Sequence, residues 1–214
     1  MAQSALNRHW KFMLAISLIT TVLSVVVSVV LSPLEYRAQV RLFISPTVSP
    51  SGVLYDDYTA LKSAEQIGQT LSNVIRTTLF QDKVIAAISD AKDITLQELV
   101  DVSDDQYSRR TKWQSQVDPL VLKGTGILTI STFDVDKVRA ESLATVVANV
   151  AIQEVPNYVP GKVTVRIVDP ALATQYPVRP NIPLRALFGF IFGGLFAGMY
   201  WYLKPSPRPF DFGI

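Results

Sequence analysis

Two long apolar stretches lie near the ends of the chain and enclose a region of mixed character. Residues 12–31 contain no charged side chain, and residues 183–203 contain one, Arg185, close to the start. About 20 apolar residues are enough for a helix to cross the hydrocarbon core of a bilayer. The pattern therefore predicts two transmembrane helices, 12–31 and 183–203, on either side of a domain formed by residues 32–182.

A cleaved signal peptide is the alternative interpretation of the first stretch. The apolar part of a signal peptide is about 7–15 residues long and precedes a cleavage site of small residues. The run from Phe12 to Leu31 is longer, and no Ala-x-Ala site follows it within reach. We therefore expect the run to be retained as the first of two spans.

Basic residues flank both apolar stretches on the side away from the central domain. They are Arg8 and Lys11 before the first stretch and Lys204 and Arg208 after the second. Because such residues collect on the cytoplasmic side of a membrane, we expect residues 1–11 and the tail 204–214 in the cytoplasm. The sequence thus predicts a two-pass protein of the plasma or inner membrane whose central domain, 32–182, is extracytoplasmic.

Short periodic patterns fill the central region. Residues 35–45 alternate like a half-buried strand, with Tyr36, Ala38, Val40, Leu42 and Ile44 on one side and Arg37, Gln39 and Arg41 on the other. Two prolines and a glycine then indicate a loop over 45–52. Further along, the patterns predict a helix from the Asp56-Asp57 pair to residue 75, helices over 78–90, 95–102 and 136–159, and strands over 119–124, 127–133 and 163–169. The polar stretch 103–119 is expected to be a solvated loop, with a patch between subunits as the alternative.

Apolar residues at helical spacing assign an inward face to three of these helices. The inward sets are Leu61, Ala64, Gly68, Leu71 and Ile75; Leu79, Val84, Ile85 and Ile88; and Val138, Leu143, Val146, Val147, Val150 and Ile152. We expect Asp134 or Asp136 to cap the long helix. The first and last strands adjoin the two apolar stretches, so we expect them to be neighbours in the sheet. The order of elements predicts an α+β fold, a small sheet with helices on one face.

The prolines Pro177, Pro180 and Pro183 precede or open the second apolar stretch. Each fixes its own φ and favours an extended residue before it, which predicts a stiff, extended strap between the domain and the second span. Within that span, Gly189 and Gly193 form one small-residue pair and Gly194 and Gly198 form another. Hydroxyl residues recur at similar spacing in the first span, at Ser17, Thr20, Thr21, Ser24 and Ser28. Small residues on one face allow close helix packing, although such residues are also simply common in membrane helices.

The residues that carry catalysis are sparse. The chain of 214 residues has no cysteine and one histidine, His9, and its formal net charge of +2 does not suggest nucleic acid as a partner. There is no phosphate-binding loop, and the Asp56-Asp57 pair is better explained as a helix cap than as a metal site. We therefore expect no enzyme activity, no cofactor and no metal; a carboxylate pair of a hydrolase is the alternative that sequence spacing does not test.

Several strings resemble the chain-length determinant (Wzz-like) family of polysaccharide copolymerases. They are YRAQVRLFIS, AEQIGQTL, GILTISTFDVDKVRAESLATVVANVA and IVDPALATQYPVRPN, the last with its Pro-x-x-Pro at Pro177 and Pro180 before a glycine-bearing span. The short region 90–123 is similar to the compact capsule modulators of Gram-positive type.

The resemblance implies a non-enzymatic regulator of capsule, exopolysaccharide or O-antigen chain length that forms a homo-oligomeric ring beside the polymerase and export machinery. It also implies a separate cytoplasmic tyrosine kinase as a partner, with Phe210 and Phe212 of the tail as contact residues; a disordered end is the alternative for that tail. A membrane-anchored sensor or adaptor that signals through the tail is the second functional hypothesis. Membrane lipid is a partner in either case.

Overall fold

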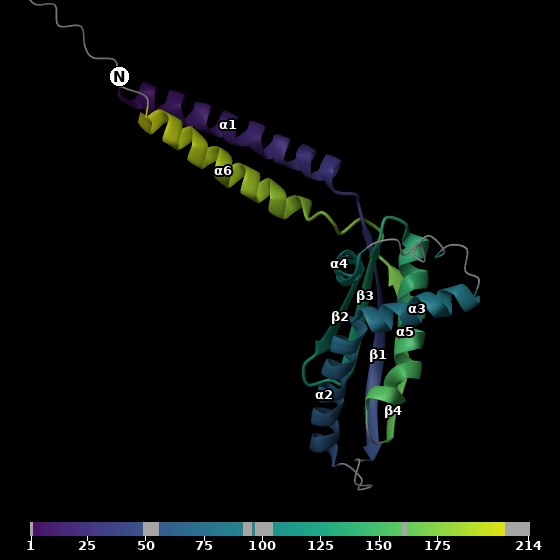
Figure 1. Ribbon diagram of the computed structural model, residues 1–214. Helices are drawn as coiled ribbons and strands as arrows, with labels where there is room; N and C mark the ends of the chain where they lie inside the picture. The colour runs from purple at the N-terminus through teal and green to yellow at the C-terminus, as the bar shows by residue number, and fades with distance from the viewer. Residues whose placement is uncertain (1, 49–55, 92–95, 97–104, 160–161, 204–214) are drawn as a thin grey trace, which may run out of the picture. The chain divides into compact units, whose positions relative to one another are not determined.

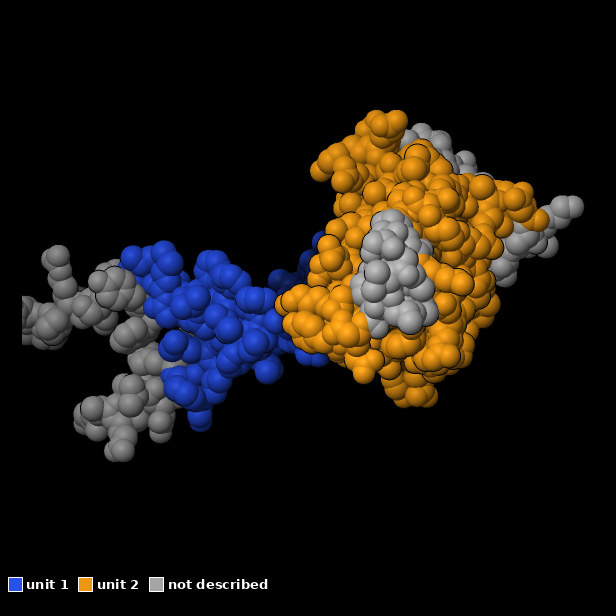
Figure 2. Space-filling model, turned by 90° about the horizontal axis from the view of Figure 1, so that it is seen from below, with its two compact units in different colours: residues 1–34, 179–214 blue, residues 35–178 orange. Residues whose placement is uncertain are grey.

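The computed structural model divides into two compact units, coloured separately in Figure 2. One unit consists of residues 1–34 and 179–214, and the other of residues 35–178. The structure describes residues 2–48, 56–91, 96, 105–159 and 162–203.

The smaller unit is a pair of antiparallel helices, α1 (Ala2–Leu31) and α6 (Ile182–Leu203), which lie side by side (Figure 1). The segments Met13–Leu31 and Ile182–Tyr200 are long and apolar enough to cross a membrane, with mean hydropathies of 2.6 and 1.6. Only 11% and 17% of these segments are buried. The core helix of a soluble protein would be mostly buried, so the exposed apolar surface is consistent with two spans of a membrane protein.

The larger unit is built on a four-stranded antiparallel sheet in the order β2-β3-β1-β4. Its strands are β1 (Tyr36–Val48), β2 (Val117–Leu122), β3 (Ile127–Asp134) and β4 (Lys162–Ala173). β1 and β4 pair directly, as expected for the first and last strands. The α+β fold class predicted from the sequence is confirmed.

Three helices pack on this sheet: α2 (Asp57–Ile75), α4 (Gln106–Gln116) and α5 (Lys137–Tyr158). A fourth, α3 (Thr78–Ala91), packs on these helices and not on the strands. Both α2 and α5 contact β1 in the middle of the sheet (Figure 1). Ala38, Val40, Leu42 and Ile44 of β1 are at most 1% exposed beneath the helices. The period-2 alternation therefore identified the core face of β1 correctly from Ala38 to Ile44, whereas Tyr36, also predicted on this side, is only half-buried.

The turn between β2 and β3 depends on two glycines. Gly124 and Gly126 have φ values of 70° and 63°, which L-residues with a side chain rarely adopt. A Cβ on Gly126 would also lie 3.1 Å from the carbonyl oxygen of Ile44. This turn sets the register of the hairpin, in which Leu122 pairs with Ile127.

Two strands continue through prolines, and the predicted loop at 45–52 begins too early. β1 runs through Pro46 to Val48. The amide of Ile44 points toward β3 and donates to the carbonyl oxygen of Gly126. The nitrogen of Pro46, two residues later, points to the same side, but the pairing of β1 with β3 does not extend beyond Phe43 and Ile127. Because proline has no amide hydrogen, Pro46 would leave an acceptor unpaired only opposite a paired residue, and so no hydrogen bond of the sheet is lost here. β4 likewise continues through Pro170 to Ala173, which is tolerated because β4 is an edge strand.

The prediction of a solvated loop over 103–119 is wrong. Residues 106–116 form α4, whose N-cap Asp105 accepts a hydrogen bond from the amide of Tyr107. Trp113 is 3% exposed, and its Nε1 donates to the carbonyl oxygen of Ile75 at 2.7 Å. A single buried aromatic residue on an otherwise polar helix leaves no apolar stripe for sequence reasoning to detect.

The predicted inward faces of the other helices need three corrections. In α2 Leu61 is 42% exposed, whereas Ala64, Gly68, Leu71 and Ile75 are buried as predicted. In α3 the buried residues are Phe80, Val84 and Ile88, spaced by four, whereas Leu79 is 61% exposed. In α5 Val138 is 58% exposed, and much of the buried face is alanine: Ala140, Ala144, Ala148 and Ala151. Alanine lets α5 pack closely on the sheet, but it gives a weak apolar signal. The helix expected over 95–102 lies outside the described residues except for Leu96, which is buried.

Candidate functional site: the helix pair and the base of the domain

The two apolar helices approach closely at two glycines of α6. A Cβ on Gly189 would lie 2.8 Å from the Cβ of Ser24, and one on Gly193 would lie 1.9 Å from the Oγ1 of Thr20. Real Cβ atoms do not come this near to such neighbours, so any side chain at either position would push the helices apart. Small residues serve this purpose in helix pairs within membranes.

Two hydroxyl groups of α1 bond across this contact. The Oγ1 of Thr20 lies 3.0 Å from the carbonyl oxygen of Gly189, and the Oγ of Ser24 lies 3.1 Å from that of Arg185. Ser17 and Ser28, on the same face, are 3% and 1% exposed. The hydroxyl residues of the first stretch therefore lie toward α6 and not toward the surroundings.

The second pair of glycines lies farther from α1. A Cβ on Gly194 would lie 3.4 Å from the Oγ of Ser17, and one on Gly198 would lie 3.6 Å from the Cε of Met13. These are ordinary van der Waals distances. Of the two glycine pairs considered from the sequence, Gly189 and Gly193 make the closer contact with α1.

Pro183 lies inside α6 and not in the strap before it. The Oδ1 of Asn181 accepts a hydrogen bond from the amide of Leu184 at 3.3 Å, and the carbonyl oxygen of Asn181 accepts one from the amide of Arg185. Asn181 is thus the N-cap, and Pro183 falls in the first turn, where a helix needs no amide hydrogen. The strap is therefore confined to the residues between β4 and Asn181, which include Pro177 and Pro180.

The first part of the strap remains hydrogen-bonded to the residues that lead into β1. The amide of Thr174 donates to the carbonyl oxygen of Arg37, and the amide of Val178 donates to that of Glu35, each at 2.8 Å. The Oγ1 of Thr174 in turn accepts from the amide of Arg37 at 3.2 Å. The chain thus enters and leaves the larger unit through two segments that are joined to each other. We call this end of the unit its base.

The amino end of α5 holds the same segments from the side. The Oε1 of Glu141 accepts from the amide of Ala173 at 2.8 Å. The Nζ of Lys137 donates to the carbonyl oxygen of Gln175 at 2.8 Å and lies 4.8 Å from the centre of the Tyr36 ring. These residues were not identified from the sequence, because side chain to backbone bonds between distant segments leave no local pattern.

The carboxylate of Asp134, just before α5, is buried next to the contacts of Lys137 and Glu141. The side chain of Asp134 is 5% exposed. Its Oδ1 accepts from the Nε and Nη2 of Arg139, at 2.9 and 2.8 Å, and from the amide of Asp136 at 2.9 Å. Asp136 itself caps α5 by accepting from the amide of Val138. Of the two expected caps, Asp136 is therefore the actual one, and Asp134 orders the turn before it.

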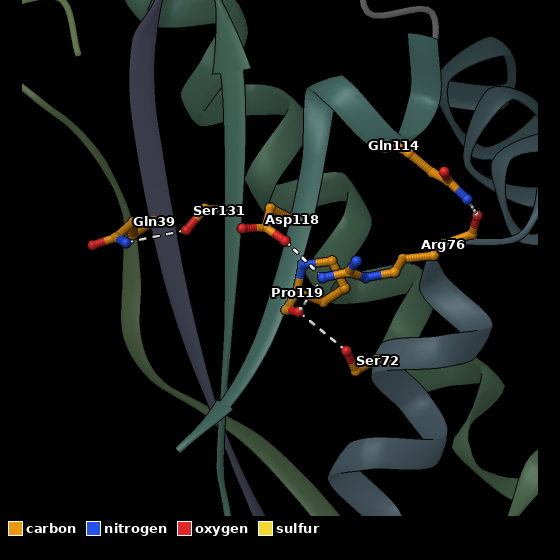
Figure 3. A network of polar contacts seen from close by, with 7 residues as sticks. All are labelled: Gln39, Ser72, Arg76, Gln114, Asp118, Pro119 and Ser131. Atoms are coloured by element: carbon orange, nitrogen blue, oxygen red, sulfur yellow. Dashed lines mark hydrogen bonds and ion pairs between the residues drawn. The ribbon is translucent and has the colours of Figure 1, made fainter. Parts of the chain in front are cut away.

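Other polar contacts bind helices to the edges of the larger unit (Figure 3). The Nη2 of Arg76 donates to the Oδ1 of Asp118 at 2.7 Å and to the carbonyl oxygen of Pro119 at 3.2 Å, which also accepts from the Oγ of Ser72. The Nε2 of Gln114 reaches the carbonyl oxygen of Arg76 at 3.5 Å. The network therefore fastens the end of α2 to the edge strand β2, and α4 to the end of α2.

An ion pair fastens α3 to α5 away from the base. Lys83 pairs with Glu154, which also accepts from the Nδ2 of Asn157 at 3.0 Å. The hydrogen bond to Glu154 raises the pKa of Lys83 above its ordinary value. The hydrogen bonds from Lys83 and then Asn157 lower the pKa of Glu154. Both groups are therefore held in their charged forms, as in a structural ion pair.

Among the described residues, no group of three or more histidine, cysteine, aspartate or glutamate side chains could hold a metal ion. Asp56 occupies the N-cap position of α2, but its side chain makes no capping hydrogen bond, and Asp57 lies in the first turn. The tail residues Phe210 and Phe212 lie outside the described residues. The site defined by the structure is thus a set of packing and hydrogen-bonding contacts.

The fold and these contacts define a class of protein: an α+β domain joined at its base to two helices that are long and apolar enough to cross a membrane. No protein-family model matches the sequence, and no curated protein matches it either.

Proposed function

We propose that this chain is a non-enzymatic membrane regulator of surface polysaccharide polymerisation, chain length and export. In this proposal α1 and α6 span the plasma or inner membrane, the larger unit is extracytoplasmic and both ends of the chain are cytoplasmic. The basic residues that flank the two apolar stretches support this orientation.

The observation that carries the proposal is the joined entry and exit of the larger unit. Only residues 32–35 separate α1 from β1, and before α6 begins the strap after β4 is bonded to Glu35 and to Arg37 at the start of β1. Two anchors connected in this way hold a domain at a membrane more firmly than one flexible tether does. A regulator that measures a growing polymer beside a membrane enzyme requires such a fixed position.

The resemblance to chain-length determinants supplies the substrate class and the partners. The proposed assembly is a homo-oligomeric ring of extracytoplasmic domains beside a polysaccharide polymerase and its export machinery. A separate cytoplasmic tyrosine kinase would contact the tail through Phe210 and Phe212. In this role the protein needs no catalytic residues of its own.

Deletion of the gene tests the proposal directly. The expected result is an altered length distribution or amount of the exported polysaccharide on a sizing gel, restored by the wild-type gene on a plasmid. A distribution and amount unchanged from the parent strain contradict the proposal.

Orientation is tested separately. The chain has no cysteine, so a single Lys123→Cys variant, placed in the exposed β2–β3 turn, provides a unique thiol. A membrane-impermeant thiol reagent added to intact cells should label it. Labelling only after the cells are opened would indicate that the larger unit is cytoplasmic and would contradict the proposed orientation.

A further inference from the structure

The base of the larger unit carries apolar side chains that no other part of the unit covers. Val135 and Val138, at the start of α5, are 52% and 58% exposed, and Tyr176 of the strap is 73% exposed. They lie around one point, since Lys137 between the two valines donates to the carbonyl oxygen of Gln175, next to Tyr176. We call these three residues the basal surface.

Four charged groups beside the basal surface are engaged within the protein. Lys137 bonds to Gln175 and lies over the ring of Tyr36, Asp136 caps α5, and Asp134 pairs with Arg139. Together with Glu35, Arg37, Glu141 and Arg179 on the neighbouring segments, four carboxylates and four basic groups therefore balance one another. The surface that remains available is apolar and aromatic, with no excess of either charge.

The length of the chain limits how far the base can be from a membrane. α1 ends at Leu31 and β1 begins at Tyr36, and five fully extended steps of the chain cover at most about 18 Å. The headgroup layer on one side of a bilayer is itself about 5–8 Å thick. If α1 crosses a membrane and ends at the edge of the hydrocarbon core, the start of β1 lies at most about 10–13 Å beyond that layer, so the base stays close to the membrane.

We propose that the basal surface of Val135, Val138 and Tyr176 rests in the headgroup layer of the membrane and makes direct contact with lipid. This inference depends on the two-span arrangement of the proposed function and adds to it a lipid-binding surface on the domain itself. Tyrosine is enriched at this depth because its ring is apolar and its hydroxyl is polar. The contact would stop the domain from pivoting about its two connections.

A second copy of the chain is the competing occupant of this surface. Lipid is favoured because the base is the end from which both connections to the apolar helices leave, so the membrane is within reach of every copy. The balance of charges further predicts that the contact does not require anionic lipid and is insensitive to salt, unlike binding by a basic patch.

The test uses the full-length chain in lipid nanodiscs, with one engineered cysteine at a time carrying an environment-sensitive fluorophore. Val138→Cys reports on the basal surface. Leu122→Cys is the matched control, since Leu122 is 53% exposed and Val138 is 58% exposed. The two positions are separated by the length of β3, eight residues or about 27 Å. Val22→Cys, on the exposed side of α1, reports whether the helices are inserted.

Lipids with a spin label on the headgroup should quench more than half of the fluorescence at Val138 and leave Leu122 unaffected, equally in neutral and anionic nanodiscs. Equal quenching at Val138 and Leu122, or none at Val138, contradicts the inference. Protection of Val138 from water without quenching by lipid also contradicts it and indicates a second copy as the occupant.

The Val22 label separates failure of this inference from failure of the proposed function. One outcome is that lipids labelled in the acyl chain quench Val22 while Val138 remains unquenched. This result would support the two spans and contradict only the contact of the basal surface with lipid. Absence of quenching at both Val22 and Val138 would show that the helices are not inserted and would contradict the proposed two-span arrangement.

A double variant, Val135→Asp with Val138→Asp, tests the basal surface itself, with the fluorophore on Tyr176→Cys. Quenching of this label by headgroup-labelled lipid should be mostly lost, because charged side chains at these exposed positions disfavour insertion into the headgroup layer without disturbing the core.

Discussion

The Oγ1 of Thr20 lies 3.0 Å from the carbonyl oxygen of Gly189, one helical turn before Gly193, whose missing side chain leaves room for Thr20. This relationship joins a hydroxyl of α1 to the backbone of α6 and requires the two helices to be close. The same hydroxyl also lies 3.0 and 2.9 Å from the carbonyl oxygens of Ile16 and Ser17. Its single hydrogen is therefore shared, so we expect the steric fit at Gly193 to matter more than the hydrogen bond.

Replacement of Gly193 by alanine should destabilise the helix pair. A Cβ there would overlap Thr20 and lie 2.8 Å from the Cα of Ser17, and the backbone cannot move aside as a flexible side chain could. We expect a loss of about 1–3 kcal/mol, typical of an overpacked contact, in SDS titrations of the full chain in mixed micelles. Gly194→Ala is the matched control and should show no loss. Similar behaviour of the two variants would contradict the assignment of the interface.

Removal of the Thr20 hydroxyl should have a smaller effect. Thr20→Val keeps the shape of the side chain and loses only the polar contact to Gly189. Hydrogen bonds between helices in membranes contribute about 0.6 kcal/mol on average, so the same titration should shift only slightly. A shift as large as that of Gly193→Ala would show that the hydrogen bond, and not the packing, dominates.

The strap should influence polymer length without affecting the stability of the domain. The double variant Pro177→Ala, Pro180→Ala removes two rings that fix the backbone between β4 and α6, so the connection becomes less rigid. We expect a changed polymer length distribution and an unchanged melting temperature. Pro156→Ala, at an exposed position near the end of α5, is the control and should leave polymer length unchanged. Wild-type polymer from the double variant would argue against a role for the strap.

Trp113→Phe should test the anchoring of α4. Phenylalanine fills much of the same space but leaves the carbonyl oxygen of Ile75 without its donor, at a cost of about 1–3 kcal/mol. Thermal or urea unfolding of the full chain measures this loss. Tyr107→Phe on the same helix is the control, because Tyr107 is 78% exposed, and a change within about 0.5 kcal/mol is expected. If Trp113→Phe were equally neutral, the buried hydrogen bond would be of no consequence.

The Lys83–Glu154 pair predicts how stability depends on pH. The lowered pKa of Glu154 contributes stability that is present above about pH 4.3, its unfolded value, and is lost as pH falls through the folded one. The raised pKa of Lys83 contributes stability that is present below about pH 10.4 and is lost as pH rises through its folded value. The contribution of the pair is therefore greatest between these limits.

The measurement is the difference in melting temperature between wild type and Lys83→Met across the pH range. The difference should be constant near neutral pH and should shrink at both extremes. Lys123→Met, in the exposed turn, should show no such dependence. A difference between wild type and Lys83→Met that did not vary with pH would mean that lost packing of the lysine side chain, and not its charge, causes the effect.

The sequence alone determined those features that depend on neighbouring residues. The alternation in residues 36–44 defined the buried side of β1, because successive side chains of a strand point to opposite faces and only one face can be covered. The lengths of the two apolar stretches identified both candidate spans, since hydrophobic length is a property of a segment by itself.

The tertiary structure decided the features that depend on which surfaces meet. Gly193 and Gly194 are adjacent in an apolar helix and point about 100° apart, so only the position of α1 could select Gly193. Trp113 is buried because Ile75, far away in sequence, presents a free carbonyl oxygen to it. Pro46 is tolerated because its nitrogen faces the side on which the pairing of β1 with β3 has ended, and Pro170 is tolerated because β4 is an edge strand. Lys137 and Glu141 hold the base through backbone groups whose positions no local pattern encodes.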